Sequence, residues 1–165
     1  MEKINIIGTS GGALAAINAA LLYPEKINRI IADSFEGEYA LDIIGENIEN
    51  EREASKTDPD MVGFWERNHG KDWETVVDND TKAIIKHYQN VRNFFPGKLS
   101  ELKVPVLLTG SLEDEFSEYV SFETTYGKMF EEIPVGRMYL FRKGGHPAFI
   151  TAGEEFLEIA KEFFE

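Results

Sequence analysis

Short apolar runs rich in β-branched side chains recur along the chain, and longer helix-forming segments separate them. The runs have the length and composition of buried strands, and they occupy residues 3–7, 27–32, 104–109 and 137–142. The first two runs, with the apolar helix predicted between them over residues 11–23, make a strand–helix–strand unit about thirty residues long. Because such crossovers are right-handed and join parallel strands, the sequence predicts an α/β protein with a mostly parallel sheet of about four strands flanked by helices.

Residues 38–100 differ from the rest of the chain, because they are rich in charged and aromatic residues and in helix formers. Helical periodicity predicts four helices there, over residues 40–54, 59–68, 73–79 and 80–93. In the first of these, the isoleucines lie on one face and the glutamates largely on the other. We interpret the block as a helical cap inserted into the sheet-forming part of the chain.

Two further helices complete the pattern. Residues 117–133 predict one that Gly127 could interrupt, and residues 154–165 predict a closing amphipathic helix. The chain shows neither an internal repeat nor a low-complexity linker. We therefore expect a single domain over residues 1–165, with a core formed by residues 1–37 and 101–165.

Composition narrows the function classes. Hydrophobic residues make up 42% of the 165 residues, which is typical of a globular chain. The formal net charge of −13 argues against nucleic acid or an anionic membrane as a partner. The chain has no cysteine, which excludes disulfides and cysteine–zinc sites and is compatible with the cytoplasm, where we expect the protein. No motif indicates a metal or a cofactor, and we expect neither.

The candidate chemistry begins directly after the first predicted strand. Residues 8–12 read Gly-Thr-Ser-Gly-Gly and match the pattern G-x-S-x-G, with Ser10 at its centre. A strand before this pattern and a helix after it form a nucleophile elbow, a sharp turn that exposes the serine hydroxyl. The backbone N–H of Gly11 then lies where it can stabilise an oxyanion, at the positive end of the following helix.

A serine nucleophile needs a base, and the chain offers three histidines. His69 and His87 lie in the predicted helical insertion with no turn residues around them, and we interpret both as surface residues. His146 lies in a loop of sequence Gly-Gly-His-Pro directly after the fourth predicted strand. Parallel sheets place their ligands at the carboxyl ends of the strands, so we favour His146 as the base.

The base needs a carboxylate to orient it, and three acids follow the third predicted strand at residues 113–115. We choose Asp114, with Glu113 as the main competitor, because a sequence does not fix a one-residue register. Asp33, at the end of the second predicted strand, is a remoter candidate. A role for Asp33 as a helix or turn cap together with Ser34 is the more frequent outcome for such a pair.

Ser10, Asp114 and His146 follow one another in the chain order of the α/β-hydrolases. The sequence resembles the C-terminal half of this superfamily, of the small bacterial esterase-like type, in four segments: residues 6–26, 30–37, 104–116 and 144–148. The resemblance implies Ser10 as nucleophile, Asp114 as acid and His146 as base. It also implies hydrolysis of carboxylic esters through an acyl-enzyme, and it identifies the helical insertion with the variable cap of the family.

The strands that precede the elbow in this family are absent, and with them the loop that supplies the second oxyanion donor. The first strand then becomes a sheet edge, which invites pairing with another chain. We expect a homodimer that buries this strand. The alternative to an esterase is a catalytically weak or inactive half-domain that acts through self-association or a partner chain.

The expected substrate is a small soluble ester, although the same three residues also serve thioesters and amides. Four aromatic side chains flank the expected site or lie in the cap, and they are candidate substrate contacts: Phe35, Trp65, Phe116 and Phe149.

Overall fold

The computed structural model describes residues 2–165, which divide into two compact units. The first contains the chain up to Glu38 and Phe94–Glu165, and the second is Tyr39–Asn93. The second unit corresponds to the predicted helical insertion, which ends nearer to residue 93 than to residue 100. Residues after Asn93 belong to the first unit because Leu99 and Leu102 are buried there.

The first unit contains a parallel sheet of four strands in the order β1-β2-β3-β4. The strands are β1 (Ile4–Thr9), β2 (Ile27–Asp33), β3 (Val106–Ser111) and β4 (Gly136–Phe141), and this confirms the predicted α/β class. Their register aligns Thr9 with Asp33, and Asp33 with Thr109. The carboxyl ends of all the strands therefore meet at one edge of the sheet.

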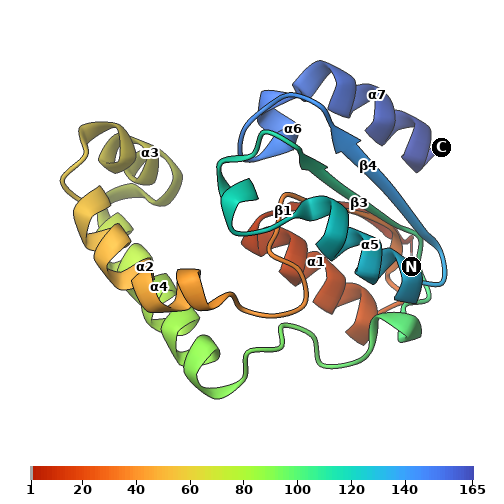
Figure 1. Cartoon of the computed structure of the whole chain (residues 1–165), viewed down its shortest axis with the longest axis horizontal. Helices are drawn as coiled ribbons and strands as arrows, with labels where there is room; N and C mark the ends of the chain where they lie inside the picture. The colour runs from red at the N-terminus through yellow and green to blue at the C-terminus, as the bar shows by residue number, and fades with distance from the viewer. Residues whose placement is uncertain (1) are drawn as a thin grey trace. The chain divides into compact units, whose positions relative to one another are not determined.

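Helices cover both faces of this sheet (Figure 1). On one face, α1 (Gly11–Leu22) packs against β1 and β2, and α5 (Phe122–Glu132) packs against β3 and β4. On the other face, α7 (Gly153–Phe164) follows the short α6 (Ala148–Thr151). Alternation along β2 explains how both faces are buried, since Ile31 packs in a cluster with Phe156 and Phe163 of α7 while Ile30 faces the opposite side.

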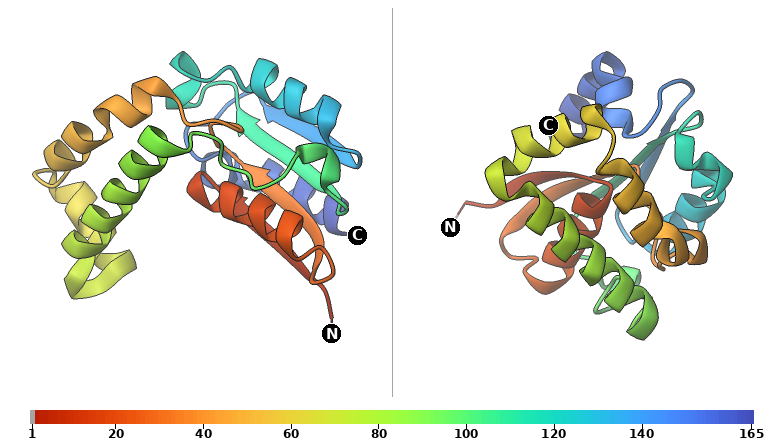
Figure 2. Two further views of the ribbon diagram at one scale, coloured as in Figure 1. Left: turned by 90° about the horizontal axis from the view of Figure 1, so that it is seen from below. Right: turned by 90° about the vertical axis from the view of Figure 1, so that its left-hand side faces the viewer.

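The second unit consists of α2 (Asp42–Ser55), α3 (Pro59–His69), the 3₁₀ turn η1 (Gly70–Asp72) and α4 (Trp73–Asn90), seen at two angles in Figure 2. The prediction of two helices over residues 73–93 was wrong, because one helix runs through the junction. Thr81 lies just after that junction, and its hydroxyl donates to the carbonyl oxygen of Val77 one turn earlier. The core of this unit contains Trp65 stacked on Trp73 with ring centroids 5.3 Å apart.

The helix predicted from residue 117 begins later than expected. The Asp114 side chain accepts a hydrogen bond from the backbone N–H of Phe116 and caps a separate 3₁₀ turn, η3 (Glu115–Glu118). Ser121 then caps α5 by accepting from the backbone N–H of Thr124. Gly127 does not interrupt α5, which runs unbroken to Glu132.

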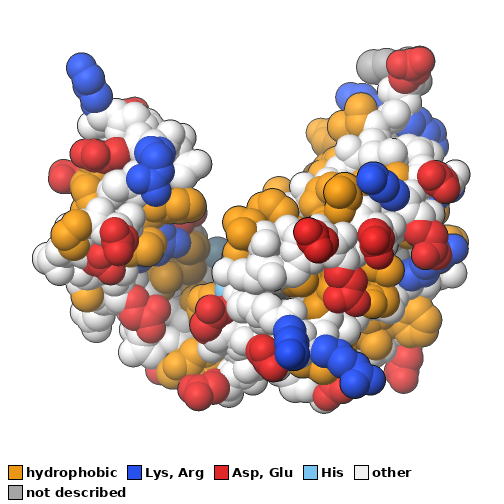
Figure 3. All heavy atoms as spheres, turned by 90° about the horizontal axis from the view of Figure 1, so that it is seen from above, with side chains coloured by type: hydrophobic (Ala, Val, Ile, Leu, Met, Phe, Trp, Pro, Cys, Tyr) orange, Lys and Arg blue, Asp and Glu red, His pale blue; other side chains and the backbone are white. Residues whose placement is uncertain are grey.

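Acidic side chains are scattered over the face drawn in Figure 3, with lysines and arginines between them. This distribution agrees with the net charge of −13, and the view shows no concentrated basic surface. Among residues 2–165, no helix has both the length and the hydrophobicity needed to cross a membrane.

Candidate active site

The turn between β1 and α1 holds Ser10 in an unusual backbone conformation. Its φ is 50° and its ψ is −126°, a region that residues other than glycine rarely adopt. Gly8 makes the turn possible, because a Cβ atom there would lie 2.3 Å from the carbonyl oxygen of Gly12. The Ser10 side chain makes no capping hydrogen bond to α1 and is exposed. The structure therefore has the geometry of a nucleophile elbow.

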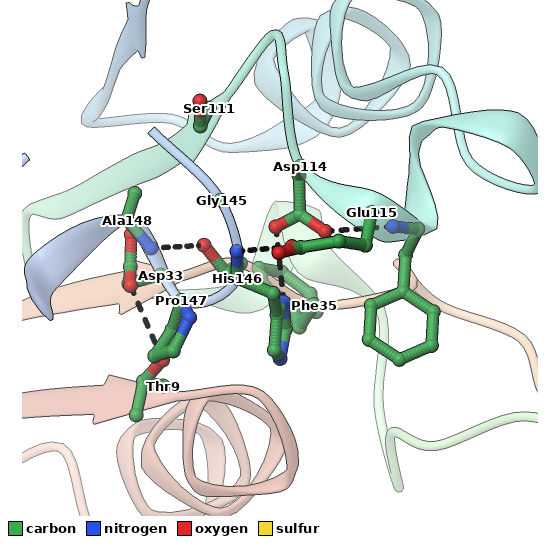
Figure 4. Close-up of polar contacts among 12 residues, drawn as sticks. Thr9, Asp33, Phe35, Ser111, Asp114, Glu115, Gly145, His146, Pro147 and Ala148 are labelled. Atoms are coloured by element: carbon green, nitrogen blue, oxygen red, sulfur yellow. Dashed lines mark hydrogen bonds and ion pairs between the residues drawn. The ribbon is translucent and has the colours of Figure 1, made fainter. Parts of the chain in front are cut away.

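His146 and Asp114 face each other across the carboxyl edge of the sheet (Figure 4). The imidazole Nδ1 lies 2.9 Å from Oδ2 of Asp114, whose side chain is almost fully buried. The other oxygen of Asp114 accepts a hydrogen bond of 2.9 Å from the backbone N–H of Phe116. A carboxylate at Nδ1 favours the tautomer with the proton on that nitrogen and leaves Nε2 as an acceptor.

Ser10, Asp114 and His146 follow β1, β3 and β4, so the parallel sheet brings them to the same edge. No hydrogen bond joins Ser10 to His146 within residues 2–165. In enzymes without substrate, catalytic hydrogen bonds are often long and tighten only when substrate binds. The structure thus pairs His146 with Asp114 and leaves the Ser10 hydroxyl separate.

The other acids near His146 have different partners. The backbone N–H of Glu113 donates to Ser111 Oγ at 3.2 Å, and the Glu113 side chain has no hydrogen bond to His146 among the described residues. Glu115 accepts a hydrogen bond of 2.5 Å from the backbone N–H of His146. The geometry therefore favours Asp114 over Glu113 as the residue that orients the imidazole, and it adds Glu115 as a support for the loop.

Asp33 is fully buried at the end of β2. Burial raises the pKa of its carboxyl group, while hydrogen bonds from Thr109, Phe149 and Thr9 act in the opposite direction. None of the hydrogen bonds found for its oxygens comes from the imidazole of His146. Asp33 is therefore not placed as the partner of the histidine. Its carboxylate and the Ser34 hydroxyl accept from the first two backbone N–H groups of α6, so the pair does act as a cap, for a helix distant in sequence.

The four candidate substrate contacts fall into two groups. Phe35 is 4% exposed and stacks on Tyr126, and Trp65 is 3% exposed and stacks on Trp73, so core packing accounts for both. Phe116 is 39% exposed, and its ring meets the His146 ring edge-on with centroids 4.8 Å apart. Phe149 is 37% exposed and follows the His146 loop.

Among the described residues, no group of three or more histidine or acidic side chains is arranged to hold a metal ion. The site consists of a hydroxyl, an imidazole with its carboxylate and the N-terminal amides of α1. These groups can perform acyl transfer by nucleophilic attack and general base catalysis.

Solved structures with the same arrangement of strands and helices are known. A serine hydrolase involved in carbazole degradation, CarC, is 21% identical to this chain with a TM-score of 0.69, and the alignment covers 99% of this chain and 64% of CarC. MGS-M2, an α/β hydrolase from a Medee basin deep-sea metagenome library, is 19% identical to this chain with a TM-score of 0.64, and the alignment covers 98% of this chain and 65% of MGS-M2. This chain has part of an α/β-hydrolase fold.

An esterase from Exiguobacterium antarcticum is also similar to this partial α/β-hydrolase fold, with 20% identity and a TM-score of 0.65, and the alignment covers 99% of this chain and 67% of the esterase. The chain thus spans about two thirds of the length of these structures. No protein-family model matches the sequence, and no curated protein sequence matches it significantly. At these identities the likeness establishes the fold, and the residues of the site carry the argument about activity.

Proposed function

We propose that this chain is a serine hydrolase that cleaves small carboxylic esters through an acyl-enzyme intermediate. The observation that carries the proposal is the 2.9 Å contact between His146 Nδ1 and the buried carboxylate of Asp114, at the sheet edge that also holds Ser10. In this proposal Ser10 is the nucleophile, His146 the general base and Asp114 the group that orients His146.

The reaction proceeds in two balanced halves. Nε2 of His146 takes the proton of Ser10 as Oγ attacks the ester carbonyl, and it then returns this proton to the departing alkoxide, which leaves as an alcohol. A water molecule next loses a proton to His146 and attacks the acyl-serine. His146 returns this proton to Ser10 Oγ as the acyl–oxygen bond breaks, which releases the carboxylic acid and restores Ser10. The backbone N–H of Gly11 stabilises the oxyanion in both halves, with the positive end of α1 behind it.

The backbone N–H of Gly11 is the oxyanion donor that this proposal names. Removal of one oxyanion donor typically lowers turnover about 10²–10³-fold. Phe116 and Phe149 are partly exposed beside the His146 loop, and we propose that they contact a small acyl group. Thioesters and amides fall within the same chemistry. A cytoplasmic location, with neither metal nor cofactor, belongs to the same proposal.

Hydrolysis of p-nitrophenyl acetate and butyrate tests the proposal, with Ser10→Ala and His146→Ala compared with matched controls. Ser55→Ala and His69→Ala are suitable controls because both side chains lie in the second unit. We expect both site variants to fall to the background rate, a loss of at least about 10³-fold, and both controls to keep the wild-type rate. Turnover that survives in Ser10→Ala would contradict the proposed nucleophile.

A second candidate is a half-domain that acts by association. The exposure of the edge strand favours it, since Ile4 is 56% exposed and Ile7 is 49% exposed on β1. An apolar edge strand is a template for pairing with another chain, and we propose a homodimer that buries it. A folded protein without Ser10-dependent turnover would favour this function over hydrolysis.

A further inference from the structure

The carboxylate of Asp33 connects the nucleophile elbow to the loop that carries His146. Its Oδ2 accepts a hydrogen bond of 3.1 Å from the hydroxyl of Thr9, the residue before Ser10. The same oxygen accepts a hydrogen bond of 3.1 Å from the backbone N–H of Phe149. Figure 4 shows Asp33 between Thr9 and this loop. One buried oxygen therefore joins two segments that lie more than a hundred residues apart in sequence.

The residue after Asp33 strengthens this connection. Ser34 Oγ accepts a hydrogen bond of 2.9 Å from the backbone N–H of Ala148, and Ser34 has a positive φ of 50°. The end of β2 thus binds two successive amides, those of Ala148 and Phe149, immediately after Pro147. Since His146 precedes Pro147, these contacts fix the end of the loop from which the imidazole projects.

Burial of a carboxylate lowers the stability of the fold, which suggests that Asp33 serves a function other than stability. Asp33 is fully buried, and burial without compensation disfavours the charged form. Its remaining oxygen, Oδ1, accepts a hydrogen bond of 2.8 Å from the Thr109 hydroxyl. The Asp33 carboxylate thus accepts hydrogen bonds from three donors, which lie on β1, on β3 and in the loop. An apolar side chain at this position could accept none of them.

We propose that Asp33 is a positioning residue, which sets the separation of the elbow and the His146 loop so that His146 Nε2 can reach Ser10 Oγ. This inference rests on the proposed hydrolase function. Asp33 has no hydrogen bond to the imidazole among the described residues, so it acts through the backbone of the loop and leaves the orienting role to Asp114.

The choice of variants follows from the individual hydrogen bonds. In Asp33→Asn, the amide oxygen can accept from both Thr9 and Phe149, and the amide nitrogen can donate to the Thr109 hydroxyl, which turns to accept it. In Asp33→Ala, all these contacts are lost. Thr81→Val is the control for destabilisation, because it removes a buried hydroxyl in the second unit.

Two readouts are measured for each variant: kcat and KM for p-nitrophenyl acetate, and the ¹⁵N shifts of the His146 ring, which report the nitrogen that carries the proton. For Asp33→Ala we expect kcat to fall about 10- to 100-fold with KM nearly unchanged, and the ring to lose its single Nδ1–H tautomer. Asp33→Asn restores both readouts to within a few-fold of wild type. Thr81→Val lowers the unfolding temperature and changes neither readout.

A folded Asp33→Ala protein with wild-type kcat and an unchanged His146 tautomer would overturn the inference. If Asp33→Ala does not fold, Thr9→Val removes one of the two contacts at Oδ2, and a wild-type kcat and tautomer in that variant would overturn it equally. The two proposals fail separately. Wild-type protein without Ser10-dependent turnover refutes the hydrolase function, and the tautomer of His146 in the variants still decides the positioning role.

Discussion

Replacement of Asp114 by asparagine tests the proposed roles of His146 as base and Asp114 as the carboxylate that orients it. The substitution keeps the shape of the side chain, and the amide must satisfy two contacts that the carboxylate now accepts: the backbone N–H of Phe116 at 2.9 Å and Nδ1 of His146 at 2.9 Å. The Phe116 N–H can only donate, so the amide oxygen turns toward it. The amide nitrogen then faces His146, whose Nδ1 must become the acceptor.

This reversal places the imidazole proton on Nε2, the nitrogen that accepts the proton of Ser10 in the proposed reaction. In a serine protease, the same aspartate-to-asparagine change lowers kcat about 10⁴-fold. At about 1.36 kcal/mol for each factor of ten, the expected loss of transition-state stabilisation is about 5.4 kcal/mol. The assay is the kcat of p-nitrophenyl acetate hydrolysis, and the unfolding temperature shows that the fold is intact.

Glu113→Gln is the matched control, because it makes the same chemical change at the neighbouring residue. Its side chain has no hydrogen bond to His146 in the described chain, so kcat should stay within about twofold of wild type. The reasoning is refuted if Glu113→Gln abolishes turnover while Asp114→Asn keeps it. That result would assign the orienting role to Glu113.

Further predictions concern the elbow, the buried carboxylate and the edge strand. Gly8→Ala should lower the free energy of unfolding, measured in urea, by about 1–3 kcal/mol, because the new Cβ would lie 2.3 Å from the carbonyl oxygen of Gly12. Gly12→Ala is the control and should not lower it, because a Cβ there meets nothing within 4 Å. Burial raises the pKa of Asp33 above 3.8, so the folded wild type binds this proton more tightly than the unfolded chain does. As the pH rises above 3.8, the free energy of unfolding of wild type should therefore fall relative to that of Asp33→Asn, and the gap between the two should become constant at higher pH. A gap in urea unfolding that does not change with pH would contradict this. In analytical ultracentrifugation, wild-type protein should sediment as a dimer and Ile7→Lys as a monomer. Wild-type protein that sediments as a monomer would refute the proposed dimer.

The strands were predictable from sequence because each is a short apolar run bounded by turn residues. Every one of them appears in the structure within two residues of its expected ends. The elbow was also predictable, since Gly8 and Ser10 meet local steric requirements that depend on their immediate neighbours. Such features need no knowledge of distant segments.

Features that depend on distant segments could not be predicted in the same way. The role of Asp33 follows from the register that aligns it with Thr9 and Thr109, and from the path of a loop 116 residues later in sequence. The start of α5 was missed because two competing caps, Asp114 and Ser121, lie close together, and only the packed structure shows that each begins its own turn.

Covalent labelling of the protein tests the central claim most directly. A fluorophosphonate reacts with a serine only when a base has activated it, and mass spectrometry identifies the modified peptide. The account predicts a single adduct on Ser10 that is absent in Ser10→Ala and strongly slowed in His146→Ala. A folded wild-type protein that remains unlabelled, or one labelled on another serine, would contradict the claim that Ser10 is an activated nucleophile.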